Sequence, residues 1–438
     1  MTKPATPPMP SPRPAAEGSE CCAEMARVEG LSRRRFLQAA AATGIASTSV
    51  FGDTVRQTAY AATTGGNVLV VLSLRGGVDG LGMVVPHGDP AYAAARPTIA
   101  VPTGSLLGKD AMFGLHPSLA PLQGMWDAGR MAAVHAVGLE MPNRSHFAAM
   151  EEVEDADPTS RERRGWVNRM VGLDDAVQPW SAMHVNAAMT PAMMAGPVPT
   201  VACSDLDSFS VPGISSDDSL APRRRRSLAR AWGREKGPLG RAARTAVVTS
   251  QRLGAIGDAA YAPSSPYPTD WPARPLGDAL KDTAALVKAD IGVEVVSLDY
   301  GSFDHHANYG TTEWGPMQDK LRGLAQAVDA FFRDLGPTGE RVTLVTISEF
   351  GRRVKENGSR GLDHGWGNAM LVMGGGVKGG RYLGRWPGLA QGSLVDGDLQ
   401  VTTDYRQVLG EVLTRRFPDR SIAQVFPGLA YAPLGLMS

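Results

Sequence analysis

Short, almost continuous apolar segments that alternate with stretches of helical periodicity constrain the fold of this chain most strongly. The clearest are residues 67–74 (NVLVVLSL), 130–137 (RMAAVHAV) and 341–348 (RVTLVTIS). Segments of this kind are typical of strands buried on both faces of a parallel sheet. Further strands are predicted at residues 181–186, 198–203, 293–299 and 368–373.

Helical patterns separate these predicted strands. Apolar residues from Met317 to Phe331 follow one another at intervals of 4, 3, 4 and 3, which is the spacing of one helix face. Other helices are predicted at residues 117–128, from about Ser145, at 278–288 and at 403–413. The alternation predicts an α/β fold with a doubly wound, mostly parallel sheet and helices on both faces. Such sheets bind ligands beyond the carboxyl ends of their strands.

The first 61 residues have the pattern of an export signal. Arg33 and Arg34 precede Phe36-Leu37, a short run of small apolar residues follows, and Ala59-Tyr60-Ala61 is a small-x-small cleavage pattern. This layout is typical of a twin-arginine signal, although an arginine-rich linker is the alternative. We therefore expect residues 1–61 to be removed after contact with the twin-arginine translocase. Residues 62–438 would form one periplasmic or secreted domain. Since no later segment has 18 or more apolar residues, no stable membrane anchor is expected.

Charge and cysteine content exclude several classes of function. Without residues 1–61 the chain has 37 Lys/Arg and 39 Asp/Glu, so no nucleic-acid partner is expected. The one basic run, Arg223–Arg226, lies in a polar insert near residues 204–240. We interpret it as a solvated loop, with anion binding as the alternative. Cys203 is the only cysteine after the signal, which excludes an intramolecular disulfide and argues against a thiolate metal site.

Acidic and imidazole side chains follow the predicted strands at the points where these end. They are Asp79, Arg144-Ser145-His146, Asp304-His305-His306, Glu349 and Asp363-His364. Because the carboxyl ends of parallel strands share one edge, these loops are expected to meet, and carboxylates with imidazoles suit a divalent ion. Simpler roles stay open. Ser145 would then only cap a helix, Asp79 would bind backbone amides, and Glu349 would pair with a neighbouring arginine.

Five segments together resemble one known family. They are LRGGVDGLGMVVP, NRSHF, GSFDHHANYG, TISEFGRRVKENGSRGLDHGWGN and TTDYRQVLGEVL. With the signal, they resemble the twin-arginine-exported, uncharacterised domain family of the alkaline phosphatase and sulfatase superfamily, over essentially the whole exported chain. The resemblance implies one or two divalent ions (Zn, Mn, Ca or Mg). The implied ligands are Asp79, Asp304, His306, Glu349 and His364, with Asp363 as an alternative.

The resemblance also implies a reaction. Ser145 would attack a phosphate or sulfate ester of a small molecule or glycan, and Arg144 would contact the ester oxygens. Glu349-Phe350-Gly351 stands where the superfamily often has Asp-His-Gly, so one imidazole ligand is missing and a single metal is at least as well supported as two. Cys203 lacks the sequence context of a sulfatase nucleophile. The alternative function is an exported binding or assembly protein that keeps the fold without turnover.

Overall fold

The computed structural model describes residues 65–438 except 160, 175–176, 208, 210–218, 234, 236, 258 and 260. The predicted signal segment, with its paired arginines, lies outside the described residues. No helix in the described part of the chain is long and apolar enough to cross a membrane.

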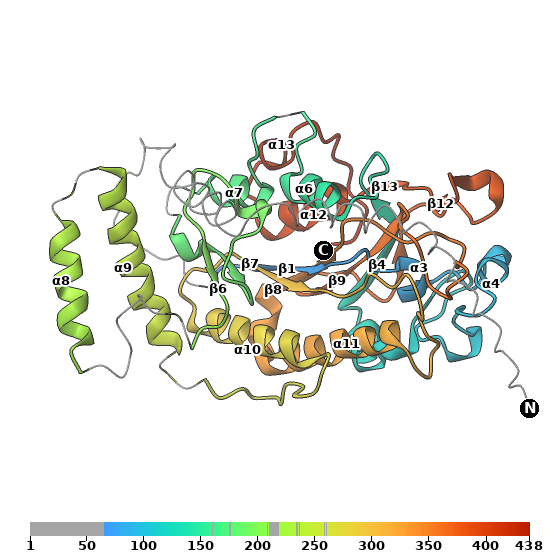
Figure 1. Cartoon of the computed structure of the whole chain (residues 1–438), viewed down its shortest axis with the longest axis horizontal. Helices are drawn as coiled ribbons and strands as arrows, with labels where there is room; N and C mark the ends of the chain where they lie inside the picture. Colours follow the sequence, from blue (N-terminus) through green and yellow to red (C-terminus); the bar gives the residue numbers. More distant parts are fainter. Residues whose placement is uncertain are drawn as a thin grey trace, which may run out of the picture. The chain divides into compact units, whose positions relative to one another are not determined.

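A nine-stranded sheet forms the centre of the described chain (Figure 1). Its spatial order is β10-β4-β9-β8-β1-β7-β5-β6, and β13 pairs with β4. All strand pairs are parallel except those of β9, which confirms the predicted α/β class with a mostly parallel sheet. The bounds are β1 Val68–Leu74, β4 Met131–Gly138, β5 Ala182–Val185, β6 Val201–Cys203, β7 Val295–Tyr300, β8 Val342–Ile347, β9 Asn368–Gly374, β10 Tyr382–Leu383 and β13 Thr403–Asp404.

The reversed direction of β9 matters for the site. β9 lies between β4 and β8 and is antiparallel to both. It therefore begins at the edge where β1, β4, β7 and β8 end. The loop that precedes β9, which contains His364, is brought to the carboxyl ends of the parallel strands for this reason.

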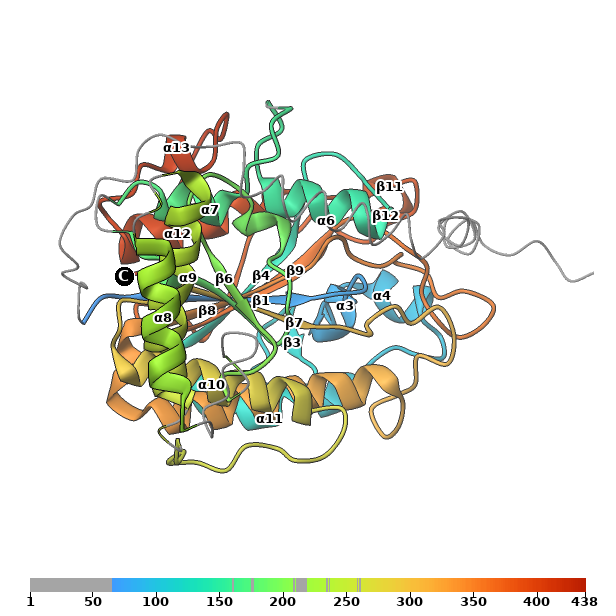
Figure 2. The same cartoon turned by 60° about the vertical axis from the view of Figure 1, so that its left-hand side comes forward.

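Helices cover both faces of the sheet (Figures 1 and 2). On one face lie α10 (Arg274–Ala289) and α11 (Pro316–Leu335), and on the other lie α6 (His146–Asp155), α7 (Trp166–Val171), α12 (Tyr405–Arg416) and α13 (Ile422–Val425). Alternate residues of β1 belong to two separate cores. Val70 and Leu72 pack in one core with α10 and α11, whereas Leu69 and Val71 pack in the other with α7 and α12. Burial on both faces explains the continuous apolar pattern of this strand.

The polar insert predicted near residues 204–240 contains a helix where a loop was expected. Residues Ala221–Gly233 form α8 and Pro238–Gly257 form α9. Arginine and alanine are good helix formers, and Pro222 lies in the first turn, where its missing N–H costs nothing. α8 packs against α9, and α9 packs against α10. The basic run Arg223–Arg226 is therefore helical.

Two predicted helix boundaries also differ from the structure. The helix expected at residues 117–128 is a 3₁₀ helix, η2 (Pro117–Leu122), followed by α5 (Gln123–Asp127), since Pro121 cannot donate within a regular α-helix. The last helix is capped by Asp404, which accepts from the amide of Arg406 at 2.8 Å, and not by Thr403. The remaining elements are α3 Gly80–Met83, β2 Val84–Val85, α4 Pro90–Ala95, η1 Thr103–Ser105, β3 Gly114–Leu115, η3 Pro179–Ser181, η4 Ala192–Met194, η5 Gly336–Arg341, η6 Gln391–Ser393, β11 Leu394–Val395 and β12 Asp398–Leu399.

Candidate metal centre

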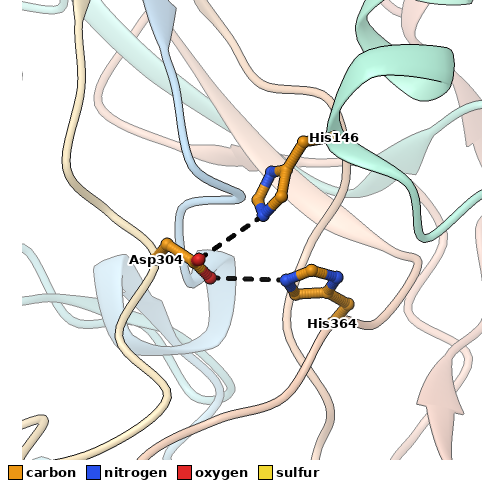
Figure 3. Close-up of side chains that lie close together, drawn as sticks. All are labelled: His146, Asp304 and His364. Atoms are coloured by element: carbon orange, nitrogen blue, oxygen red, sulfur yellow. Dashed lines mark hydrogen bonds and ion pairs between the residues drawn. The ribbon is translucent and has the colours of Figure 1, made fainter. Parts of the chain in front are cut away.

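Three imidazoles surround one carboxylate at the carboxyl edge of the sheet. His146 begins α6 after β4, Asp304 and His306 follow β7, and His364 precedes β9. Figure 3 shows His146 and His364 approaching the carboxylate of Asp304 from two sides. The ligand atoms of His146, Asp304 and His364 all lie within 4.8 Å of one another.

The distances place each Nε2 atom next to the carboxylate. Asp304 Oδ1 lies 3.0 Å from His306 Nε2 and 3.3 Å from His364 Nε2. Asp304 Oδ2 lies 3.6 Å from His146 Nε2. The Nε2 atoms of His306 and His364 are 3.0 Å apart. His146, Asp304 and His364 therefore form one compact group, and His306 lies beside its Asp304 and His364 members.

Each of the three rings is oriented through its other nitrogen. Nδ1 of His146 contacts Glu349 Oε1 at 2.7 Å, and Nδ1 of His306 contacts Asp363 Oδ1 at 3.1 Å. Nδ1 of His364 contacts the backbone carbonyl of Arg144 at 2.8 Å. Carbonyl and carboxylate oxygens only accept, so each Nδ1 donates, and a neutral ring presents the lone pair of Nε2. Metal-binding histidines are oriented in the same way.

A positive charge is needed between these groups. When His306 and His364 are both neutral, their contact sets two lone pairs against each other and against Asp304. Nε2 of His146 is buried and has no hydrogen-bond partner, because its 3.6 Å contact with Asp304 is too long. A proton or a divalent cation resolves both problems. Three imidazole nitrogens and one carboxylate oxygen are donors that zinc and related ions accept, so the residues present fit a divalent ion.

The carboxylate of Asp304 is held by Arg352. The Arg352 side chain is 1% exposed, and its Nη2 donates to Asp304 Oδ1 at 2.6 Å. The same guanidinium donates to the carbonyls of Gly77 at 2.6 Å and Leu362 at 3.0 Å. Burial raises the pKa of Asp304, but the neighbouring rings of His146 and His364 and the hydrogen bond from Arg352 outweigh it and hold that pKa well below its usual range.

Charge around His146 favours a bound cation or proton there. Burial lowers the pKa of His146, but the neighbouring carboxylates of Asp304 and Glu349 outweigh it and raise that pKa to about 9. Burial also raises the pKa of Glu349, but the hydrogen bonds from His146 and from backbone amides, among them that of Gly76, together lower it by more. The pair of carboxylates thus stabilises positive charge at this imidazole, either on the ring or next to Nε2.

Two predicted ligands lie behind the imidazoles. Glu349 contacts His146 and also accepts from the amide of Gly76 at 2.8 Å and from the hydroxyl of Ser348 at 2.9 Å. Asp363 contacts His306 and accepts from Asn357 Nδ2 at 2.9 Å. Both acids therefore orient ligand rings in the described geometry, one contact further out than predicted.

Asp79 is not brought to the centre, contrary to the expected ligand set. Its Oδ1 accepts from Arg96 Nη2 at 3.0 Å, and its Oδ2 accepts from Arg96 Nη1 at 2.6 Å and from the Tyr309 hydroxyl at 2.7 Å. Asp79 and Arg96 are 2% and 0% exposed. Because Arg96 cannot lose its charge, Asp79 forms a buried ion pair, and both of its oxygens are already used.

Ser145 and Arg144 lie beside the imidazoles in the chain. Ser145 is at the N-cap position of α6, but its hydroxyl makes no capping hydrogen bond, so a capping role is not seen. Its amide donates to Asn143 Oδ1 at 3.1 Å. Arg144 donates from Nε to the buried Asp398 at 2.9 Å, while its carbonyl accepts from His364. The nucleophilic role of Ser145 stays a prediction.

Sequence reasoning missed His146 as a ligand. The roles predicted for the loop after β4 fall on its neighbours Arg144 and Ser145. The available signal was its place in a loop at the same sheet edge as Asp304 and His364, next to the start of a predicted helix. His305, by contrast, is half-buried, its buried Nε2 has no hydrogen-bond partner, and burial, followed by the charge of Arg352, lowers its pKa to about 4.

The fold and the site define an α/β protein with a group of imidazoles and a carboxylate, a candidate metal site, at the carboxyl edge of its sheet. Residues 265–419 match the model of a family described as "Protein of unknown function (DUF1501)". That stretch contains Asp304, His306 and His364, whereas His146 lies outside it. No curated protein matches the sequence.

The chain is weakly similar to several solved structures. The C-terminal periplasmic domain of EcEptC from Escherichia coli, solved with Zn, has 8% identity and a TM-score of 0.35, over 74% of this chain and 77% of that one. An alkaline phosphatase superfamily protein from Vibrio parahaemolyticus has 11% identity and a TM-score of 0.31, over 75% and 67%. The PsFucS1 sulfatase from Pseudoalteromonas sp. has 10% identity and a TM-score of 0.32, over 85% and 73%. Similarity this weak says nothing about activity.

Proposed function

We propose that this protein is an exported, metal-dependent hydrolase of phosphate or sulfate esters. The observation that supports it best is the arrangement of His146, His306 and His364 around Asp304. Each ring donates from Nδ1 to an acceptor, and each directs Nε2 to the same carboxylate. Such second contacts fix both tautomer and orientation of metal ligands.

The proposed site consists of metal ligands and of residues that orient those ligands. Asp304 and the three histidines would bind a divalent ion, which when bound supplies charge stabilisation for the ester oxygens and lowers the pKa of a nucleophile. Glu349 and Asp363 keep the proton of their histidines on Nδ1. Arg352 holds the carboxylate of Asp304 in one orientation, with Oδ2 left toward His146.

Ser145 is the proposed nucleophile. It immediately precedes His146 and stands at the start of α6, a helix of ten residues whose free N–H groups favour a developing anion. Its hydroxyl is not used for capping. During attack the bond from Oγ to the phosphorus or sulfur forms, the hydroxyl proton passes to water, and the ester oxygen departs with its electron pair and takes up a proton from water. A second water molecule then hydrolyses the seryl ester and restores the Ser145 hydroxyl.

Arg144 is the proposed contact for the ester oxygens. It donates to Asp398 through Nε and Nη2, which leaves Nη1 able to face an anionic substrate. The side chain of Arg144 is 34% exposed, whereas that of Asp398 is fully buried. The buried carboxylate would therefore fix the guanidinium beside the metal centre, where it can donate to the oxygens of a tetrahedral phosphate or sulfate ester.

A direct test combines metal analysis with turnover. The purified full chain is assayed with p-nitrophenyl phosphate, bis-p-nitrophenyl phosphate and p-nitrophenyl sulfate, with Zn, Mn, Ca or Mg added and with chelator. We expect turnover of one ester class that chelator abolishes and that Ser145→Ala reduces at least about 100-fold. Ser118→Ala, at the start of η2, is the matched control and should keep full activity.

The outcomes separate the alternatives. Full activity in Ser145→Ala with loss in His364→Gln would keep the metal centre and move the nucleophile to water. Stoichiometric metal without turnover of any ester would instead support the alternative, a non-catalytic binding or assembly protein. If the protein neither binds a metal nor turns over any of the esters, the proposal is overturned.

A further inference from the structure

Positive charge is concentrated in the helical hairpin formed by α8 and α9. Residues 221–257 contain ten Lys/Arg and a single acid, Glu235, and thus carry a formal charge of +9. The whole chain has a net charge of zero, so the rest of it carries −9. A basic segment on an otherwise acidic chain produces a strong charge asymmetry, which orients the molecule toward an anionic partner.

The arginines of α8 form a stripe along one helix face. Arg223, Arg226 and Arg230 are exposed and follow one another at i, i+3 and i+7, which places them on the same side of the helix. Leu228 and Trp232 are half-buried and lie on the opposite side. Figure 1 shows α8 on the outer side of α9, away from the sheet. The arginine stripe therefore faces away from α9.

The same hairpin exposes large apolar side chains. Leu220, directly before α8, is 48% exposed, and Leu239 and Val248 of α9 are 68% and 39% exposed. Leu220 lies three residues before Arg223, at the end of the arginine stripe, whereas Leu239 and Val248 are nine residues apart and lie on opposite sides of α9. Arginines beside an exposed aliphatic side chain are typical of helices that lie on a membrane surface. Nucleic-acid backbones need the arginines but offer no partner for the aliphatic groups. The combination favours a lipid surface.

We propose that the α8–α9 hairpin docks this protein on an anionic phospholipid surface. The guanidinium groups of the stripe bind lipid phosphates, for which their paired N–H donors are suited. The acidic remainder of the chain is repelled from the same surface, so the hairpin is the side that approaches it. This is reversible association with a surface and does not require a membrane-spanning helix or a lipid anchor.

The experiment measures binding of the full chain to vesicles at low ionic strength. Vesicles of phosphatidylcholine with 30% phosphatidylglycerol are compared with vesicles of pure phosphatidylcholine. The test variant is R223Q/R226Q/R230Q. The matched control is R274Q/R322Q/R333Q, which also removes three positive charges. These arginines are exposed on α10 and α11, and each forms an ion pair with an acid three or four residues away in its own helix. Glutamine is a good helix former, and circular dichroism verifies that α8 is retained.

We expect the wild type and the control to bind the anionic vesicles and not the neutral ones. Each arginine contributes about fivefold, the equivalent of about 1 kcal/mol near an anionic surface, so the test variant should bind on the order of 100-fold more weakly. R223K/R226K/R230K should retain most of the affinity because it keeps the charge. Salt at about 0.5 M should release the wild type.

Three results would overturn the proposal. The first is equal binding of the wild type to neutral and anionic vesicles. The second is an equal loss of binding in the test variant and the control, because binding would then follow net charge and not the stripe. The third is displacement of the wild type from vesicles by a low concentration of duplex DNA that it binds more tightly, which would assign the hairpin to nucleic acid.

Discussion

The Nε2 atoms of His306 and His364 lie 3.0 Å apart, and each of these rings donates a hydrogen bond from Nδ1. Two neutral imidazoles in this geometry direct their lone pairs at one another. A tetrahedral ion with ligand bonds of about 2.0 to 2.1 Å sets its nitrogen ligands slightly more than 3 Å apart. The contact is therefore close to the spacing that a shared ion requires, and it leads to the first prediction.

Replacing His364 should remove metal binding without unfolding the protein. His364→Gln keeps a polar side chain but loses an imidazole ligand. Loss of a residue that only orients a ligand lowers metal affinity about 10- to 100-fold, so loss of the ligand should lower the affinity for Zn at least about 100-fold. His87→Gln, in a loop where Nε2 contacts the carbonyl of Asp110, is the control and should leave the affinity unchanged. Titration calorimetry measures both. Unchanged affinity in His364→Gln would show that the ion, if any, binds elsewhere.

Glu349→Gln tests whether Glu349 is a ligand or orients one. In the structure Glu349 accepts from His146 Nδ1, and glutamine retains an acceptor oxygen there. We expect metal affinity to fall about 10- to 100-fold, as for other orienting partners. Asp363→Asn should lower metal affinity to a similar extent, because Asp363 accepts from Nδ1 of His306. A loss in Glu349→Gln as large as that in His364→Gln would instead place Glu349 among the ligands, as the sequence predicted.

Asp79→Asn should destabilise the fold and leave metal affinity unchanged. The substitution leaves the buried Arg96 without its charge partner, and breaking a buried ion pair in this way costs about 3 to 5 kcal/mol of unfolding free energy. Asp319→Asn, which breaks an exposed pair with Arg322 on α11, should cost about 0.5 kcal/mol or less. Urea unfolding and metal titration are measured on the same samples. A large loss of metal affinity without destabilisation would restore Asp79 as a ligand.

Two buried histidines predict a loss of stability on mild acidification. Burial lowers the pKa of His116 and of His135 to about 4. The unfolded chain takes up these protons near pH 6.5, whereas the folded protein does not until about pH 4, so stability present above pH 6.5 is lost between these values. Each histidine contributes up to about 3 kcal/mol, at 1.36 kcal/mol per pKa unit.

His135→Phe isolates this effect from the carboxylates that titrate over the same range. The His135 ring stacks on Phe113 at 4.3 Å between centroids, and its Nδ1 has no hydrogen-bond partner. Phenylalanine therefore keeps an aromatic ring for this stacking and loses no hydrogen bond at Nδ1. Between pH 6.5 and 4 the variant should lose less unfolding free energy than the wild type. Parallel curves for the two proteins would mean that His135 is protonated in the folded state.

The class of fold could be predicted because buried positions are occupied by apolar residues, and their spacing is visible in the sequence. Leu69 to Leu72 of β1 contact two cores, so all four of these positions are apolar, and the periodic apolar face of α11 is equally visible. The edge at which Asp304, His306 and His364 meet followed from the position of each at a strand end. The basic run at Arg223 was misread as a loop because its residues are polar on most sides, although arginine favours a helix.

Which of these polar residues would serve as ligands was decided by the tertiary structure. The sequence by itself determined the α/β class and the presence of Asp, Glu and His in the loops at one sheet edge. It contains no information on the direction of β9, which sets His364 against His306, or on the partner of Asp79, which is Arg96, 17 residues away. The physical reason is that a side chain's role depends on which charge lies within a few ångströms, and that neighbour is brought there by long-range packing.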